Sequence, residues 1–174
     1  MIQNKTFEMT KISMLACFIA VTGMIKIPSP IPGSEFQLSA PIAVAIVAVF
    51  GFWRYMIAGM LSSTVLFLLG LHTIINVEIS MIFRLTVGLI VSILGPSAPV
   101  LLIAGPIGSL TARIGLAETL QVNAWPLIIG AVPGMIFTMA AVLPITKALK
   151  RVSFKTEDNR RKSKAIPLKK KASL

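Results

Sequence analysis

The stretch HTIINVEISMIFRLTVG, residues 72–88, decides the fold because it places Arg84 inside a segment that is otherwise apolar enough to cross a membrane. An arginine at the centre of a membrane helix costs about 2.5 to 3.5 kcal/mol, so it usually faces a bundle interior or a watery cavity. On a helix, three polar residues share the face of Arg84, because they are spaced by three or four positions. They are Thr73, Asn76 and Ser80. The stripe predicts either a solute-binding surface or an ion pair that locks Arg84 to a carboxylate of a neighbouring helix.

The composition of the 174-residue chain is that of an integral membrane protein. Of its residues, 55% are hydrophobic and 13% are charged, which is too apolar for an ordinary soluble domain. Most of the net charge of +11 follows the last apolar segment, since the chain from Lys147 to its end has 11 basic and two acidic residues. A basic run in this place predicts a cytoplasmic tail, either simply solvated or bound to anionic lipid, rather than a nucleic-acid site.

We predict an all-α fold of six membrane-spanning helices in one bundle. The segments cover approximately residues 12–25, 38–53, 55–71, 73–94, 99–117 and 124–146. Pro106 should kink the fifth segment, and Pro133 should break the sixth. Residues 1–150 would then form the membrane domain, and residues 151–174 a disordered basic tail.

A stiff loop is expected between the first two segments. Residues 27–36, IPSPIPGSEF, contain three prolines, which disfavour helix at their own positions and at the preceding residues. Glu35 and Gln37 add polar groups just before the second segment. This loop is therefore predicted to be extended and exposed.

The distribution of basic residues predicts the orientation in the membrane. Six segments place both termini on one side, and the basic tail together with Arg54 assigns that side to the cytoplasm. Arg84 then lies in the outer half of its helix. Gly105, Ser109 and Arg113, spaced by four, predict a close-packing seam that brings a second arginine to the outer side, with Glu118 just beyond it. A solute that arrives from outside would meet this polar group first.

Catalytic chemistry has little support in the sequence. The chain has a single histidine, His72, and a single cysteine, Cys17, which excludes paired-histidine metal sites and an internal disulfide. Before the tail there are only four carboxylates and no aspartate, so clustered aspartates for magnesium are missing. We therefore expect no enzyme activity, catalytic residue, metal or cofactor. Energy from nucleotide hydrolysis would have to come from another chain.

The features that carry a family resemblance are the size of the chain, its six segments, the proline-rich loop and the stretch Ala16-Cys17-Phe18-Ile19-Ala20. In these features the chain resembles the substrate-binding S components of energy-coupling factor (ECF) vitamin transporters. The resemblance covers about residues 11–151. It implies a protein of the prokaryotic plasma membrane that captures a vitamin-like solute from outside, while a membrane scaffold subunit and two ATPases drive uptake. The glycine-proline-threonine-glycine-glycine-tyrosine signature of the biotin-type branch is absent, so biotin is one candidate among several.

The resemblance also assigns residues to roles. Ala16 and Ala20, with Gly23 on the same helix face, would pack on the scaffold subunit, although small residues at this spacing also serve internal packing. Together, the resemblance and the polar pattern give a set of substrate-binding candidates. They are Arg84, Asn76, Ser80, Arg113, Glu35, Gln37 and Glu118. The alternatives are a small membrane enzyme, an assembly subunit without transport activity, and a stand-alone biotin-type transporter.

Overall fold

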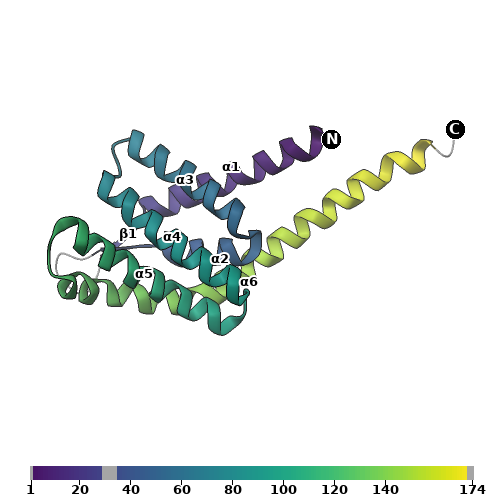
Figure 1. Cartoon of the computed structure of the whole chain (residues 1–174). Helices are drawn as coiled ribbons and strands as arrows, with labels where there is room; N and C mark the ends of the chain where they lie inside the picture. Colours follow the sequence, from purple (N-terminus) through teal and green to yellow (C-terminus); the bar gives the residue numbers. More distant parts are fainter. Residues whose placement is uncertain (1, 29–34, 172–174) are drawn as a thin grey trace.

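The computed structural model describes residues 2–28 and 35–171, which form six helices and two short strands. In chain order these are α1 (Ile2–Met24), β1 (Lys26–Pro28), β2 (Glu35–Gln37), α2 (Ser39–Phe50), α3 (Phe52–Leu68), α4 (Ile74–Leu94), α5 (Ala98–Leu120) and α6 (Ala124–Lys171). Figure 1 shows the helices gathered in one bundle, with both termini on the side away from the strand pair. The helical class predicted from composition is confirmed, with one strand pair added.

Four of the described helices are long and apolar enough to cross a membrane. They are α1 from Lys5, α4, α5, and α6 as far as Thr156. Helices α2 and α3 have 12 and 17 residues, which correspond to about 18 and 25 Å against a hydrocarbon core of about 30 Å. The chain is thus a helical membrane protein, and the crossing of all six helices stays a prediction.

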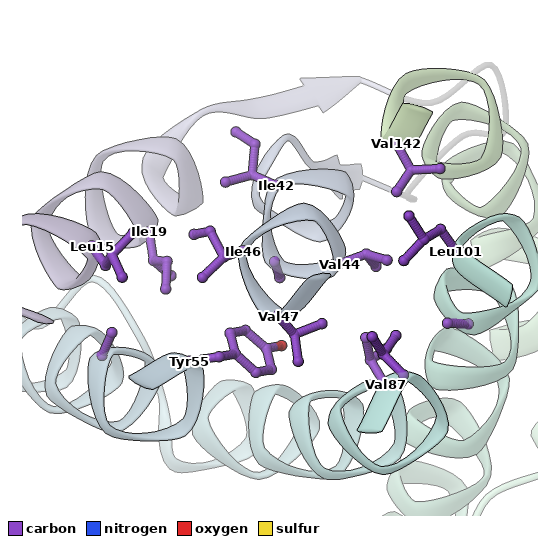
Figure 2. Close-up of a cluster of buried hydrophobic side chains, with 14 of the residues drawn as sticks. Leu15, Ile19, Ile42, Val44, Ile46, Val47, Tyr55, Val87, Leu101 and Val142 are labelled. Carbon is purple, nitrogen blue, oxygen red and sulfur yellow. The ribbon is translucent and has the colours of Figure 1, made fainter. Parts of the chain in front are cut away.

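Helix α2 is the centre of the bundle. Every residue from Pro41 to Val47 is buried, because a helix that is apolar on all faces can be covered on all faces. Helix α2 accordingly contacts each of the other five helices. Figure 2 shows this core, in which side chains of α2 meet side chains from every neighbour. The labelled residues are Leu15, Ile19, Ile42, Val44, Ile46, Val47, Tyr55, Val87, Leu101 and Val142.

The strand pair lies between α1 and α2. β1 and β2 pair antiparallel, with Lys26 opposite Gln37 and Ile27 opposite Phe36. The predicted extended loop therefore has paired ends, and its middle, residues 29–34, lies outside the described residues. The pairing positions the start of α2 beside the end of α1, where the backbone N–H of Leu38 donates to the carbonyl of Ile25 over 3.4 Å.

The prolines inside α5 and α6 do not interrupt these helices. Helix α5 continues through Pro106 and α6 continues through Pro133, so the predicted break in the sixth segment is wrong. Membrane helices tolerate internal proline where neighbours, side chains or local adjustments satisfy the freed backbone groups. Helix α6 also continues to Lys171, so the basic segment is helical here and leaves the bundle in Figure 1. The disorder expected for residues 151–174 stays a prediction.

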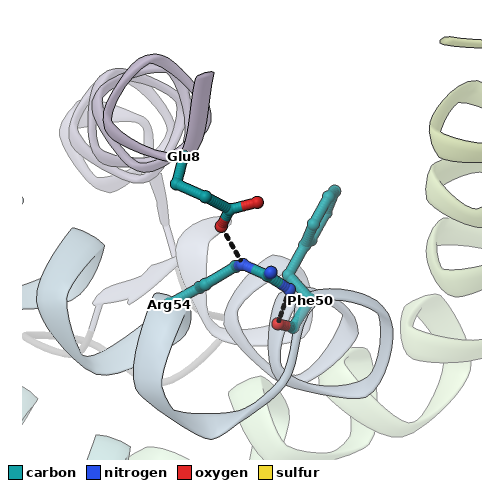
Figure 3. A network of polar contacts seen from close by, with 3 residues as sticks. All are labelled: Glu8, Phe50 and Arg54. Atoms are coloured by element: carbon teal, nitrogen blue, oxygen red, sulfur yellow. Dashed lines mark hydrogen bonds and ion pairs between the residues drawn. The ribbon is translucent and has the colours of Figure 1, made fainter. Parts of the chain in front are cut away.

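An ion pair joins α1 to α3 at the end of the bundle that holds the termini. The Arg54 Nε donates to Glu8 Oε2 over 2.6 Å, and its Nη1 donates to the carbonyl of Phe50 over 3.3 Å (Figure 3). Both charged side chains are about 40% exposed. Arg54 therefore ties the short α2–α3 junction to the first helix, away from the polar stripe of α4.

Candidate solute-binding site

A cavity of about 280 Å³ lies among the helices, in the half of the bundle nearer the strand pair. Its walls come from the first turns of α2, the first half of α4 with His72 just before it, the second half of α5 and the first half of α6, and Ile19 of α1 adds to them. Most of its polar wall comes from serine, threonine, asparagine and arginine side chains. The polar lining residues are Ser39, His72, Asn76, Ser80, Arg84, Ser109, Arg113 and Thr138. The cavity thus combines two cations with neutral hydrogen-bonding groups.

The predicted polar stripe of α4 lines this cavity. Asn76, Ser80 and Arg84 all face it, and Arg113 of α5 faces it from the adjacent helix. Thr73, at the outer end of the stripe, instead caps α4 by accepting a hydrogen bond from the backbone N–H of Asn76 over 3.3 Å. The common face is confirmed for Asn76, Ser80 and Arg84, and binding of a solute by them stays a prediction.

Arg84 is held by a hydroxyl group of α3. Its side chain is 7% exposed, and its Nη1 donates to Ser63 Oγ over 2.6 Å. Among the described residues it forms no ion pair with a carboxylate. The interpretation of Arg84 as one half of a carboxylate lock therefore finds no support in this part of the chain.

Gly59 of α3 gives Arg84 the space that it occupies. A Cβ atom built on Gly59 would lie 2.6 Å from Arg84 Nε and 2.7 Å from its Cδ. Real Cβ atoms essentially never approach heavy atoms so closely. Reasoning from sequence missed Gly59 and the role of Ser63. The available signal was their spacing of four residues, which puts them on one face of α3.

Arg113 is the second cation of the cavity. It is half-buried, and it makes no hydrogen bond or ion pair among the described residues. The predicted close-packing seam on its helix is real, because Gly105 packs directly against Thr138 of α6. Ser109, one turn before Arg113, also lines the cavity. Close packing of α5 on its neighbours therefore carries Arg113 to the same space as Arg84.

The described carboxylates before the tail lie outside the cavity. Glu8 pairs with Arg54, and Glu78 accepts a hydrogen bond from Thr119. Glu118 is exposed and borders a separate, open depression near Gln121, and its predicted part in solute binding stays a prediction. Glu35 belongs to β2, and so does Gln37, but their side chains lie outside the described part of the chain.

The small residues of α1 face the bundle. Ala16 is 8% exposed and belongs to the hydrophobic core. Gly23 is buried, and a Cβ on it would make an ordinary contact with Leu66 of α3 at 3.6 Å. Ala20 is only partly buried. This placement favours internal packing for Ala16 and Gly23, and the predicted contact with a scaffold subunit stays a prediction.

The fold and the cavity together define a helical membrane protein with a cation-lined site between its helices. The chain is 62% identical over 150 residues to Protein BioX of Lysinibacillus sphaericus, over 86% of this chain and 90% of that protein. It therefore belongs to the same family as Protein BioX. No family model matches the chain, and no solved structure matches it.

Proposed function

We propose that the protein is the substrate-binding subunit of an ECF-type transporter and captures a small anionic solute from outside the cell. Biotin or a biotin-related acid is the first candidate for this solute. In this proposal the protein binds and releases its solute without chemical change. A membrane scaffold subunit and two ATPases from other chains supply the energy for uptake.

The observation that carries the proposal is the presence of Arg84 and Arg113 in one cavity without a described carboxylate. Removing a guanidinium from water costs several kcal/mol unless a counter-charge and hydrogen bonds offset the loss. The planar fork of arginine matches a carboxylate with two parallel hydrogen bonds. An acidic group on the solute would supply both the counter-charge and the acceptors, and this favours an anion over a neutral ligand.

The name of Protein BioX suggests a connection with biotin. Biotin carries one carboxylate on a flexible chain and a neutral ureido ring that both donates and accepts hydrogen bonds. The carboxylate suits an arginine, and the ring suits neutral groups such as those of Asn76 and Ser109. A volume of about 280 Å³ is near the lower end of ordinary ligand pockets, which fits one small molecule.

The proposed direction of transport rests on the positive charge of the tail. With a cytoplasmic basic tail, the cavity end of the bundle faces outward, because the termini lie on the opposite side in Figure 1. The sequence contains no phosphate-binding loop of the kind that ATPases use. Partner ATPases in the plasma membrane of a bacterium would therefore drive the transport step.

Equilibrium binding to the purified protein in lipid nanodiscs tests the proposal. Biotin should bind at least about tenfold more tightly than its neutral amide, since a charge-assisted hydrogen bond is worth about 1.5 kcal/mol or more. Equal affinity for acid and amide would contradict an anion site. Failure of a broad panel of vitamins and related acids to bind would favour an assembly subunit. Uptake in a host that lacks ECF subunits would favour a stand-alone transporter.

A further inference from the structure

Two adjacent buried serines of α3 differ in their hydrogen bonding. Ser62 and Ser63 are both 1% exposed, so each hydroxyl is removed from water. The Oγ of Ser63 accepts the hydrogen bond from Arg84 Nη1, whereas the Oγ of Ser62 has no partner among the described residues. Ser63 is therefore the hydroxyl that fixes the end of the Arg84 side chain.

The stem of the same side chain is fixed one helical turn earlier. Gly59 lies four residues before Ser63, and a Cβ on it would overlap Arg84 at Nε and Cδ and would lie 3.1 Å from Cζ. The arginine thus crosses α3 directly over a bare backbone position. Any larger residue at position 59 would have to displace the guanidinium while Ser63 holds it.

The guanidinium connects α3 to the cavity. Arg84 is part of the cavity wall, but neither Gly59 nor Ser63 is among the described lining residues. A guanidinium has five N–H donors and Ser63 takes one of them, so we expect some of the others to be offered to a solute in the cavity that Arg84 lines. A fork whose plane is already fixed loses less conformational entropy when it binds a carboxylate.

We propose that Gly59 and Ser63 are positioning residues that orient Arg84 toward the cavity and thereby set the preference of the protein for an acid over its neutral amide. The acid preference rests on the proposed function, but the positioning of Arg84 does not. Neither residue needs to touch the solute. Their effect is transmitted only through the position of the Arg84 fork.

Dissociation constants for biotin and biotinamide, measured on variants in nanodiscs, test the proposal. Ser63→Ala should lower the acid-to-amide preference by roughly fivefold or more, because a misoriented fork loses part of a charge-assisted hydrogen bond that is worth about tenfold. Ser63→Thr keeps the hydroxyl and should retain most of the preference. Ser62→Ala is the matched control, because it removes an equally buried hydroxyl that does not touch Arg84. An equal preference in Ser63→Ala and Ser62→Ala would overturn the inference.

Gly59→Ala gives a second test with its own control. It should reduce the preference through displacement of Arg84, whereas Gly23→Ala should leave it unchanged, because the added Cβ there meets Leu66 at an ordinary 3.6 Å. If Gly59→Ala folds and keeps the wild-type preference, Gly59 has no positioning role.

Melting temperatures without any ligand separate this inference from the proposed function. Ser63→Ala should lower the melting temperature of the wild type, because it leaves a buried N–H of Arg84 without its acceptor. In an Arg84→Met background, Ser63→Ala should leave the melting temperature unchanged or raise it. Additive effects would show that Ser63 does not hold Arg84. This comparison tests whether Ser63 holds Arg84 even if biotin and biotinamide bind equally or not at all.

Discussion

Replacement of Arg84 by lysine separates the charge of this residue from its shape. Lysine keeps the positive charge in the cavity but loses the planar fork and can make only point contacts with a carboxylate. We expect a small side-chain adjustment to let the lysine ammonium donate to Ser63 Oγ, which accepts from Arg84 Nη1 over 2.6 Å in the structure. The substitution should therefore affect solute binding more than it affects the unliganded fold.

The magnitude follows from the number of hydrogen bonds lost. An arginine whose Nη1 is bound to Ser63 can still offer two parallel N–H donors to a carboxylate. Loss of one charge-assisted hydrogen bond costs about 1.5 to 3 kcal/mol. At about 1.4 kcal/mol for each factor of ten, this corresponds to at least tenfold weaker binding of biotin or a related acid.

Isothermal titration of the solute into wild-type and Arg84→Lys protein in nanodiscs measures the loss, and melting without ligand measures the fold. Glu118→Gln is the control, because Glu118 is exposed and lies outside the cavity, so it should change binding by less than about twofold. Unchanged binding in Arg84→Lys, together with lower ligand-free stability of this variant, would show that Arg84 serves the architecture of the bundle.

The remaining predictions concern the ends and faces of the bundle. Ala16→Trp should lower the free energy of unfolding, measured by denaturant titration, by about 1 to 3 kcal/mol because Ala16 is in the core. Ala20→Trp should leave solute binding unchanged but abolish assembly with a scaffold subunit, which co-purification measures. Glu8→Gln should cost less than about 1 kcal/mol in the same titration, since its ion pair with Arg54 is partly exposed. A reporter enzyme fused after Leu174 should be active only in the cytoplasm, and activity only outside the cell would reverse the orientation.

The features that depend on local spacing could be predicted from the sequence. The fourth segment, expected at residues 73–94, is α4 from Ile74 to Leu94, because Thr73 caps its beginning and Gly95 its end. The stripe of Asn76, Ser80 and Arg84 lines one cavity because positions three or four apart share a face of any helix. The same reasoning placed Arg113 on a close-packed face of α5.

The features that depend on which helix faces meet could not be predicted. Ser63 and Gly59 act on a residue of another helix, and nothing in the sequence states which face of α3 meets α4. The central place of α2 was hidden for a related reason, because a helix that is apolar all round has no pattern that identifies its neighbours. Ala16 and Gly23 showed a spacing that serves internal packing and subunit contacts equally well.

The account depends most on the claim that a small acid occupies the cavity between Arg84 and Arg113. Native mass spectrometry of the wild-type protein, purified from cells grown with biotin and released intact from nanodiscs, tests it directly. We predict a bound acid of defined mass in the wild type that is absent from an Arg84→Gln, Arg113→Gln variant that still folds and melts cooperatively. An adduct of the same mass and occupancy on both proteins, or a neutral molecule in the wild type, would contradict the claim.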